Sequence, residues 1–198
     1  MFVDCSFSIT LHNISGKEKL KKQLIDAHGK IVYTFTAHWK IVDRLKKHFK
    51  TIKIVQILLT AASAVGIFTS LIAKIPSLGW IGGTAAFLSL SINLYMLNFN
   101  LPDDIKNHTD AANELWDIRE SYISLLTDFE DLDIDMIRKQ RDKLTERVSR
   151  VNKKYPGTDS KSYKATQKAL QEEEEQTFNE GEAERLLHSG ISSDNSNE

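Results

Sequence analysis

Residues 54–97 read IVQILLTAASAVGIFTSLIAKIPSLGWIGGTAAFLSLSINLYML, and this stretch decides the fold of the chain. It consists of two apolar runs, and its only formal charge is Lys74. About 20 helical residues cross a hydrocarbon layer of about 30 Å, so each run is long enough to span a membrane. A soluble hairpin of this length would normally carry a charged stripe facing water, and neither run has one. The sequence therefore predicts transmembrane helices at 52–73 and 78–99 rather than a hairpin buried in a soluble bundle.

Basic residues are distributed unevenly around the two runs. The connection between them carries only Lys74, whereas six basic residues precede the first run: Lys40, Arg44, Lys46, Lys47, Lys50 and Lys53. Because segments rich in Lys and Arg stay on the cytoplasmic side, we expect both termini in the cytoplasm. The connection AKIPSLGW (73–80) is then an extracytoplasmic turn. In it Pro76 is expected to end the first helix, Gly79 to relax the backbone, and Trp80 to lie at the lipid–water boundary.

Length and composition exclude several classes of protein. With 198 residues the chain has no room for a large multidomain enzyme, and its net charge of −1 does not favour nucleic-acid binding. The single cysteine, Cys5, cannot form an internal disulfide, and the first residues lack the pattern of a cleaved signal peptide. The charges are segregated, however, because residues 1–53 are basic, 101–135 acidic and 136–154 basic again.

Three segments outside the spans have helical periodicity. Residues 17–51 carry a seam at two positions of a seven-residue repeat, leading directly into the first span. One series is Leu24, Ile31, His38, Leu45 and Ile52, and the other is His28, Phe35, Val42 and Phe49. Residues 102–131 and 134–154 each have one apolar face, and their short connections favour antiparallel packing, with the acidic helix between two basic ones. The predicted fold is all-α, a two-span hairpin continuous with a cytoplasmic helical or coiled-coil bundle.

Two terminal segments are expected to contribute little to this fold. Residues 1–16 are predicted to be flexible. Residues 156–198 are polar and acidic, with EEEE at 172–175, and are predicted to form a largely disordered tail. A weak helix within 162–188 is the ordered alternative.

No pattern suited to catalysis or metal binding is evident in the sequence. The six histidines include no pair spaced four residues apart. The segment DFEDLDID (128–135) lacks the glycine and the spacing of a calcium-binding loop. The glycines of GWIGG (79–83) lie at the mouth of a span, where glycine serves close helix packing. We therefore predict that the protein is not an enzyme and uses no cofactor or metal.

Polar residues within the spans form a stripe. Those at helical spacing are Gln56, Thr60, Ser63 and Ser70 in the first span and Ser89 and Asn93 in the second. Such residues either pack helices together or, in an oligomer, line a water-filled lumen, and both hypotheses stay open. In the seam, His28 and His38 either fix the register or form a pH-responsive contact.

Three segments together resemble the SLATT family of bacterial two-span membrane proteins. They are YTFTAHWKIVDRLKKHFKTIKIVQILLTAASAV (33–65), NLYMLNF (93–99) and HTDAANELWDIRESYISLLTDF (108–129). The last contains the small, aromatic and basic positions of that family, here Ala111, Ala112, Leu115, Trp116, Arg119 and Tyr122. The likeness covers residues 17–155 and leaves the tail outside.

The resemblance implies an effector of an anti-phage, abortive-infection system in the bacterial inner membrane. Such an effector is expected to oligomerise and permeabilise the lipid bilayer when triggered by a nucleotide second messenger or by a partner protein, such as a synthetase or reverse transcriptase. No direct contact with nucleic acid is expected. The alternative hypothesis is a membrane-anchored coiled-coil scaffold that docks partners without forming a pore.

Overall fold

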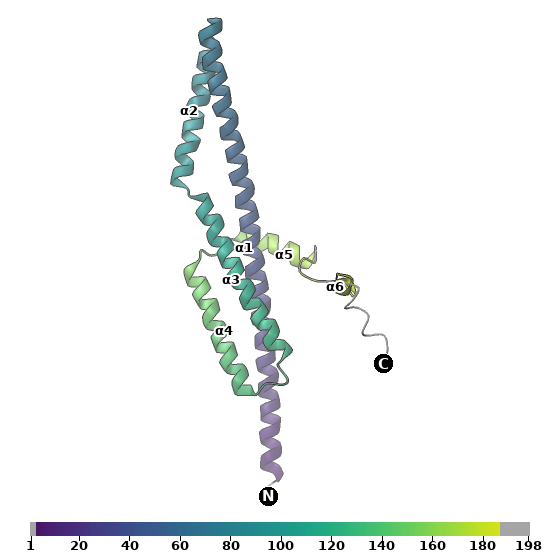
Figure 1. The fold of residues 1–198 in the computed structure, drawn as a ribbon. Coiled ribbons are helices and arrows are strands. Elements are labelled where there is room, and N and C mark those ends of the chain that lie inside the picture. Colours follow the sequence, from purple (N-terminus) through teal and green to yellow (C-terminus); the bar gives the residue numbers. More distant parts are fainter. Residues whose placement is uncertain (1–2, 187–198) are drawn as a thin grey trace.

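The computed structural model describes residues 3–186, and every regular element in that range is a helix. Helix α1 (Val3–Ala73) is a single helix of 71 residues, which corresponds to roughly 107 Å at 1.5 Å per residue. Helix α2 (Pro76–Asn98) returns along its upper end, and α3 (Leu101–Thr127) continues down its lower half (Figure 1). The predicted all-α fold, with the first span continuous with the helix before it, is confirmed.

Three further helices follow. Helix α4 (Ile134–Lys154) turns back beside α3, so that the acidic α3 contacts both α1 and the basic α4. Helix α5 (Ser160–Gln171) packs against the middle of α1, and the short α6 (Glu182–Arg185) lies beyond it (Figure 1). The chain therefore divides into the hairpin, residues 54–98, and the bundle, formed by α1 below residue 46 with α3 and α4.

Both terminal segments contain helix in the structure, and α5 overlaps the weak helix that the sequence offers within 162–188 as the alternative to disorder. Helix α1 begins at Val3, within the segment 1–16 that is expected to be flexible. The tail from residue 156 contains α5, whose Ser162, Thr166 and Ala169 are buried. Burial of this small face against α1 orders a stretch whose composition alone suggests disorder. Residues 187–198 of the tail lie outside the described range.

The turn of the hairpin is shorter than predicted. Lys74 has a left-handed backbone, with φ of 54°, Ile75 is the N-cap residue, and Pro76 begins α2. Gly79 lies inside α2, where an added Cβ would come within 2.9 Å of the Ser70 hydroxyl oxygen. The predicted role of Gly79 in relaxing the turn is therefore wrong. Gly79 instead allows the two helices to approach each other.

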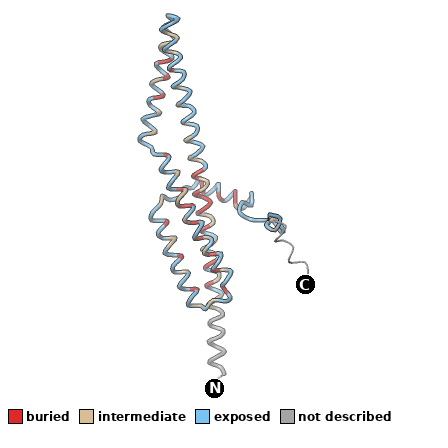
Figure 2. The backbone as a smooth tube through the Cα atoms, in the orientation of Figure 1, coloured by how far each residue is buried: buried red, intermediate tan, exposed pale blue. Residues whose placement is uncertain are grey.

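The buried side chains of the chain are concentrated in the bundle (Figure 2). Its apolar core joins α1, α3 and α4 and includes Leu24, Ile31, Phe35, Leu115, Ile118, Tyr122, Phe129, Ile137, Leu144 and Val151. The first half of the predicted heptad seam on α1 thus packs mainly against α3. The hairpin above it is exposed over most of its surface, which sets the two halves apart.

Candidate functional site

The outer surface of the hairpin is covered by large apolar side chains. Leu71 is 74% exposed, Phe87 is 69% exposed, and Trp80 and Leu97 are each 80% exposed. Of the most apolar 18-residue stretches of the two long helices, only 11% and 17% of residues are buried within the fold. In a soluble protein such helices would be covered, because exposing apolar area to water costs about 25 cal/mol per Å². The hairpin therefore has the surface of a membrane-embedded element.

Polar side chains face inward, between the two helices of the hairpin. The Gln56 side-chain amide donates a hydrogen bond to the Asn93 side-chain oxygen. One turn higher, the Thr60 hydroxyl donates to the Gln56 carbonyl oxygen at 2.9 Å. The Ser89 hydroxyl oxygen lies 2.8 Å from that of Thr60. Because the Thr60 hydroxyl hydrogen is directed at the Gln56 carbonyl oxygen, Ser89 donates this second hydrogen bond. We call these four residues the polar ladder.

Above the polar ladder the helices are in close contact. An added Cβ on Gly66 would lie 2.9 Å from Cα of Gly82, and one on Gly82 would lie 2.9 Å from the Ser63 carbonyl oxygen. Ser63 is buried at this contact, and Ser70 faces Gly79. All six polar residues predicted in the spans therefore contact the facing helix of the hairpin; Ser63 and Ser89 are buried there, whereas Thr60 and Asn93 are also exposed at its edge.

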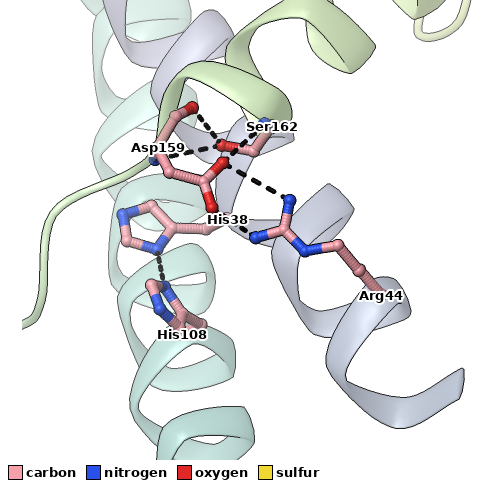
Figure 3. A network of polar contacts seen from close by, with 5 residues as sticks. All are labelled: His38, Arg44, His108, Asp159 and Ser162. Atoms are coloured by element: carbon pink, nitrogen blue, oxygen red, sulfur yellow. Dashed lines mark hydrogen bonds and ion pairs between the residues drawn. The ribbon is translucent and has the colours of Figure 1, made fainter. Parts of the chain in front are cut away.

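At the base of the hairpin, the bundle contains a pair of buried histidines. The Nδ1 atoms of His38 on α1 and His108 on α3 are 2.8 Å apart, and the side chains are 4% and 7% exposed (Figure 3). One nitrogen must carry the proton and the other must accept it, so the pair is stable only while at least one ring is neutral. Burial, and then the neighbouring His108, lower the pKa of His38 to about 4.

The surroundings of the second histidine are more polar. Burial is the main influence and lowers the pKa of His108; Asp104 and Asp159 oppose this shift, and Arg44 adds to it. These charged groups come from α3, from the start of α5 and from α1. The pKa of His108 therefore depends on the position of Asp159, the residue at the start of α5.

Asp159 attaches the start of α5 to α1 beside the histidine pair. Its carboxylate accepts a hydrogen bond from the backbone N–H of Ser162 at 2.7 Å and forms an ion pair with the Arg44 guanidinium (Figure 3). The hydrogen bond from Arg44, and then that from Ser162, lower the pKa of Asp159 to about 2. The carboxylate stays charged at any physiological pH, so this contact persists.

Further polar contacts join the end of α5 and the segment after it to residues 33–40 of α1. The Lys40 ammonium is 2.7 Å from the Glu175 carboxylate, and the Gln171 amide donates to the Tyr33 hydroxyl at 2.8 Å. We call residues 159–176 the strap. Since Arg44 precedes Ile54 by ten residues, the strap lies roughly 15 Å below the start of the hairpin.

The second predicted histidine lies elsewhere. His28 is ten residues before His38 on α1, and its Nε2 is buried without a hydrogen-bond partner among the described residues. Burial, and then the positive charge of Arg119, lower the pKa of His28. The structure thus does not bring His28 and His38 together.

Sequence reasoning missed the partner of His38 and the attachment of the strap. The position of His108 on the apolar face of its helix indicates burial but not its partner across the interface. Asp159 is followed three residues later by Ser162, and this spacing is a recognisable helix-start signal. Among the residues that the structure describes, no three His, Cys, Asp or Glu side chains lie close enough to hold a metal ion.

Comparison with known proteins gives one match. Residues 20–182 match the model of SLATT_4, the SMODS and SLOG-associating 2TM effector domain family 4. The match runs through α5 and the strap, beyond residues 17–155, over which the sequence resemblance extends. No curated protein and no solved structure matches the chain.

Proposed function

Because this chain belongs to the SMODS and SLOG-associating 2TM effector domain family, we propose that it is the membrane effector of a bacterial anti-phage system and that it permeabilises the inner membrane. Both termini lie in the cytoplasm, since the basic residues of α1 precede the first span. A nucleotide signal or a partner protein of the same defence system triggers it. The exposed apolar surface of the hairpin supports its place in the lipid bilayer.

The single observation that carries the proposal is the polar ladder inside an apolar hairpin. Two helices cannot enclose a channel, so a leak requires several chains to assemble. In the resting chain Gln56 is hydrogen-bonded to Asn93, and Thr60 to Ser89, across the hairpin. Hydrogen bonds between membrane helices are worth only about 0.6 to 1.7 kcal/mol each, so the ladder is readily opened. In an assembly the same groups then face a shared aqueous lumen.

The continuity of α1 supplies the mechanical link. The helix runs without a break from the bundle, where the signal is received, into the first span. A rotation or tilt of the lower half of α1 therefore moves Gln56 and Thr60. The position of α1 relative to α2 then changes at the polar ladder. Release of the strap or of the histidine pair would permit such a movement.

The test is the membrane potential of bacteria that overproduce the protein, measured with a voltage-sensitive dye. Overproduction favours assembly by mass action. We expect depolarisation by the natural chain and a much weaker effect of the double variant Gln56→Leu with Asn93→Leu, in which both partners are replaced and no polar group is left unpaired. The matched control is Ser91→Leu on the exposed side of α2. An unchanged potential with the natural chain would reject permeabilisation.

A hairpin exchange separates the effector from a membrane-anchored scaffold. Residues 54–98 are replaced by an unrelated two-span hairpin, and survival of infected cells is measured. The effector hypothesis predicts loss of protection, because the ladder is gone. Retained protection would show that the spans serve only as an anchor.

A further inference from the structure

A pocket lies between α1 and α5, apart from the hairpin and the histidine pair. Its volume is about 370 Å³, and its walls include Gly29, Lys30 and Tyr33 of α1 together with Thr158 and Tyr163 at the start of α5. This volume falls within the range of about 300 to 1,000 Å³ that is usual for small-molecule sites. Because the walls come from both elements, a bound molecule would contact α1 and the α5 segment at once.

Gly29 is an exposed residue of α1 that lines this pocket. A glycine in the interior of a helix is less favourable for helix formation than an alanine. No close packing explains it here, because an added Cβ would meet no atom within 4 Å. The glycine therefore keeps open a space that any larger side chain would begin to fill.

Two tyrosines provide aromatic surface at the pocket. The ring centroids of Tyr33 and Tyr163 are 5.9 Å apart, with an interplanar angle of 32°. Tyr33 is held in place through its hydroxyl by the Gln171 amide, whereas Tyr163 is 55% exposed. A planar ring that stacks on such aromatic surface gains affinity beyond that of the area that it buries.

Lys30 provides a positive charge at the same place. Its side chain is exposed and lines the pocket. Within residues 16–186 its ammonium forms no ion pair, in contrast to Lys40 and Arg44 higher on α1. An anionic group of a ligand could therefore form an ion pair with Lys30 without displacing a carboxylate from it.

From these three features we propose that the pocket between α1 and α5 binds a planar aromatic molecule that carries a negative charge. The ring stacks on the tyrosines above Gly29, and the anionic group binds Lys30. A nucleoside monophosphate and an aromatic carboxylate share this chemistry. Binding ties the strap to α1, so the site would regulate how firmly α5 is attached. The proposal concerns binding alone and does not depend on membrane permeabilisation.

The experiment uses the full chain in detergent micelles and isothermal titration calorimetry. The probes are AMP and indole-3-acetate, which distinguish the two sources of an aromatic anion. The controls are adenosine, which has the ring without the charge, and ribose 5-phosphate, which has the charge without the ring. We expect one probe to bind saturably with one site per chain, and each control to bind at least about tenfold more weakly. Absence of saturable binding of both probes at low-millimolar concentrations would overturn the proposal.

Two variants locate the site. Gly29→Leu fills the pocket while favouring the helix, and circular dichroism checks that helix content is kept; we expect loss of binding. Lys30→Gln should weaken binding of the charged probe about tenfold and leave adenosine unaffected. Lys164→Gln, an exposed lysine of α5 outside the pocket, is the matched control. Unchanged affinity in Gly29→Leu would place any observed binding elsewhere and refute the assignment.

Discussion

The bundle and the hairpin have opposite patterns of burial, although α1 runs through both. In the bundle, Leu115 is fully buried, and the buried residues of the described range include no Asp, Glu, Lys or Arg. In the hairpin, Leu97 is 80% exposed, whereas Ser89 is buried and hydrogen-bonded. The secondary structure does not change at the boundary, so the inversion reflects a change of solvent. The lower part of α1 buries its apolar side chains against other helices, as in water, whereas its upper part exposes them, as in lipid.

The inversion also explains how each half is held together. The bundle is stabilised by the burial of apolar area, which is available only in water. The hairpin has no such driving force, and relies on the contact of Gly66 with Gly82 and on the polar ladder. Matched substitutions in the two halves should therefore have different effects.

The largest difference is expected between two leucines. Leu115→Ala should lower the free energy of unfolding of the bundle by about 2 to 5 kcal/mol, because it leaves a cavity in a fully buried position. Leu97→Ala, on the exposed surface of the hairpin, should change it by less than about 0.5 kcal/mol. Both are measured by denaturant unfolding in micelles, followed by far-ultraviolet circular dichroism. Equal losses would contradict the division into a water-facing and a lipid-facing half.

A second comparison concerns two neighbouring glycines in α2. An added Cβ on Gly82 would lie 2.8 Å from the Ile67 backbone nitrogen, whereas one on Gly83 would meet nothing within 4 Å. We expect Gly82→Ala to destabilise the hairpin by about 1 to 3 kcal/mol through overpacking, and Gly83→Ala to stabilise it by up to about 1 kcal/mol, because alanine favours the helix and meets no neighbour there. Spin labels at positions 59 and 88 measure the helix separation. If both variants keep the natural separation and thermal stability, close packing does not hold the hairpin.

Sequence reasoning succeeded for features that depend on pattern along one helix. The apolar runs predicted two helices that are long and apolar enough to cross a membrane, and the apolar faces of the helices predicted the core, since both are properties of single segments. It failed for features that depend on which elements meet. The pairing of His38 with His108 and the attachment of Asp159 to Arg44 both require the distance between two segments. That distance is set by the fold and leaves no local signature.

The histidine pair should make the bundle sensitive to pH. The pKa of His38 in the folded chain is about 4, below the value of about 6.5 in an unfolded chain. The unfolded chain therefore binds more protons between these values, and stability is full above about pH 6.5 and falls as the pH is lowered. Between pH 7.5 and 5.5 we expect a loss of about 1 kcal/mol.

The measurement is thermal unfolding at the two pH values, with His38→Gln as the comparison. Asp104, Asp159 and Arg44 also face the pair, and the variant leaves all three in place. The variant should have a flatter pH profile than the natural chain. If the thermal stability of His38→Gln and of the natural chain changed equally with pH, groups other than the histidine pair would cause the pH dependence.

The smallest predicted effect concerns the strap. Asp159→Asn keeps the helix cap, because asparagine caps as well as aspartate, but it removes the charge that pairs with Arg44. An exposed ion pair is worth less than about 1 kcal/mol, so the bundle should stay folded while the amides of α5 exchange hydrogen faster. Asp135→Asn, which breaks a local pair with Arg138 in α4, is the matched control.

The strap and the histidine pair lose their contributions to stability in different pH ranges. The pKa of Asp159 is depressed to about 2, so its contribution is present above about pH 3.8 and is lost only as the pH falls toward 2. At pH 5.5 opening of the bundle around the histidine pair is favoured, because an opened His38 binds a proton, while the charge of Asp159 is unchanged. Hydrogen exchange at that pH should therefore rise where α1 meets α3 before it rises in α5. Faster exchange in α5 first would mean that the strap is held by the histidine pair rather than by Asp159.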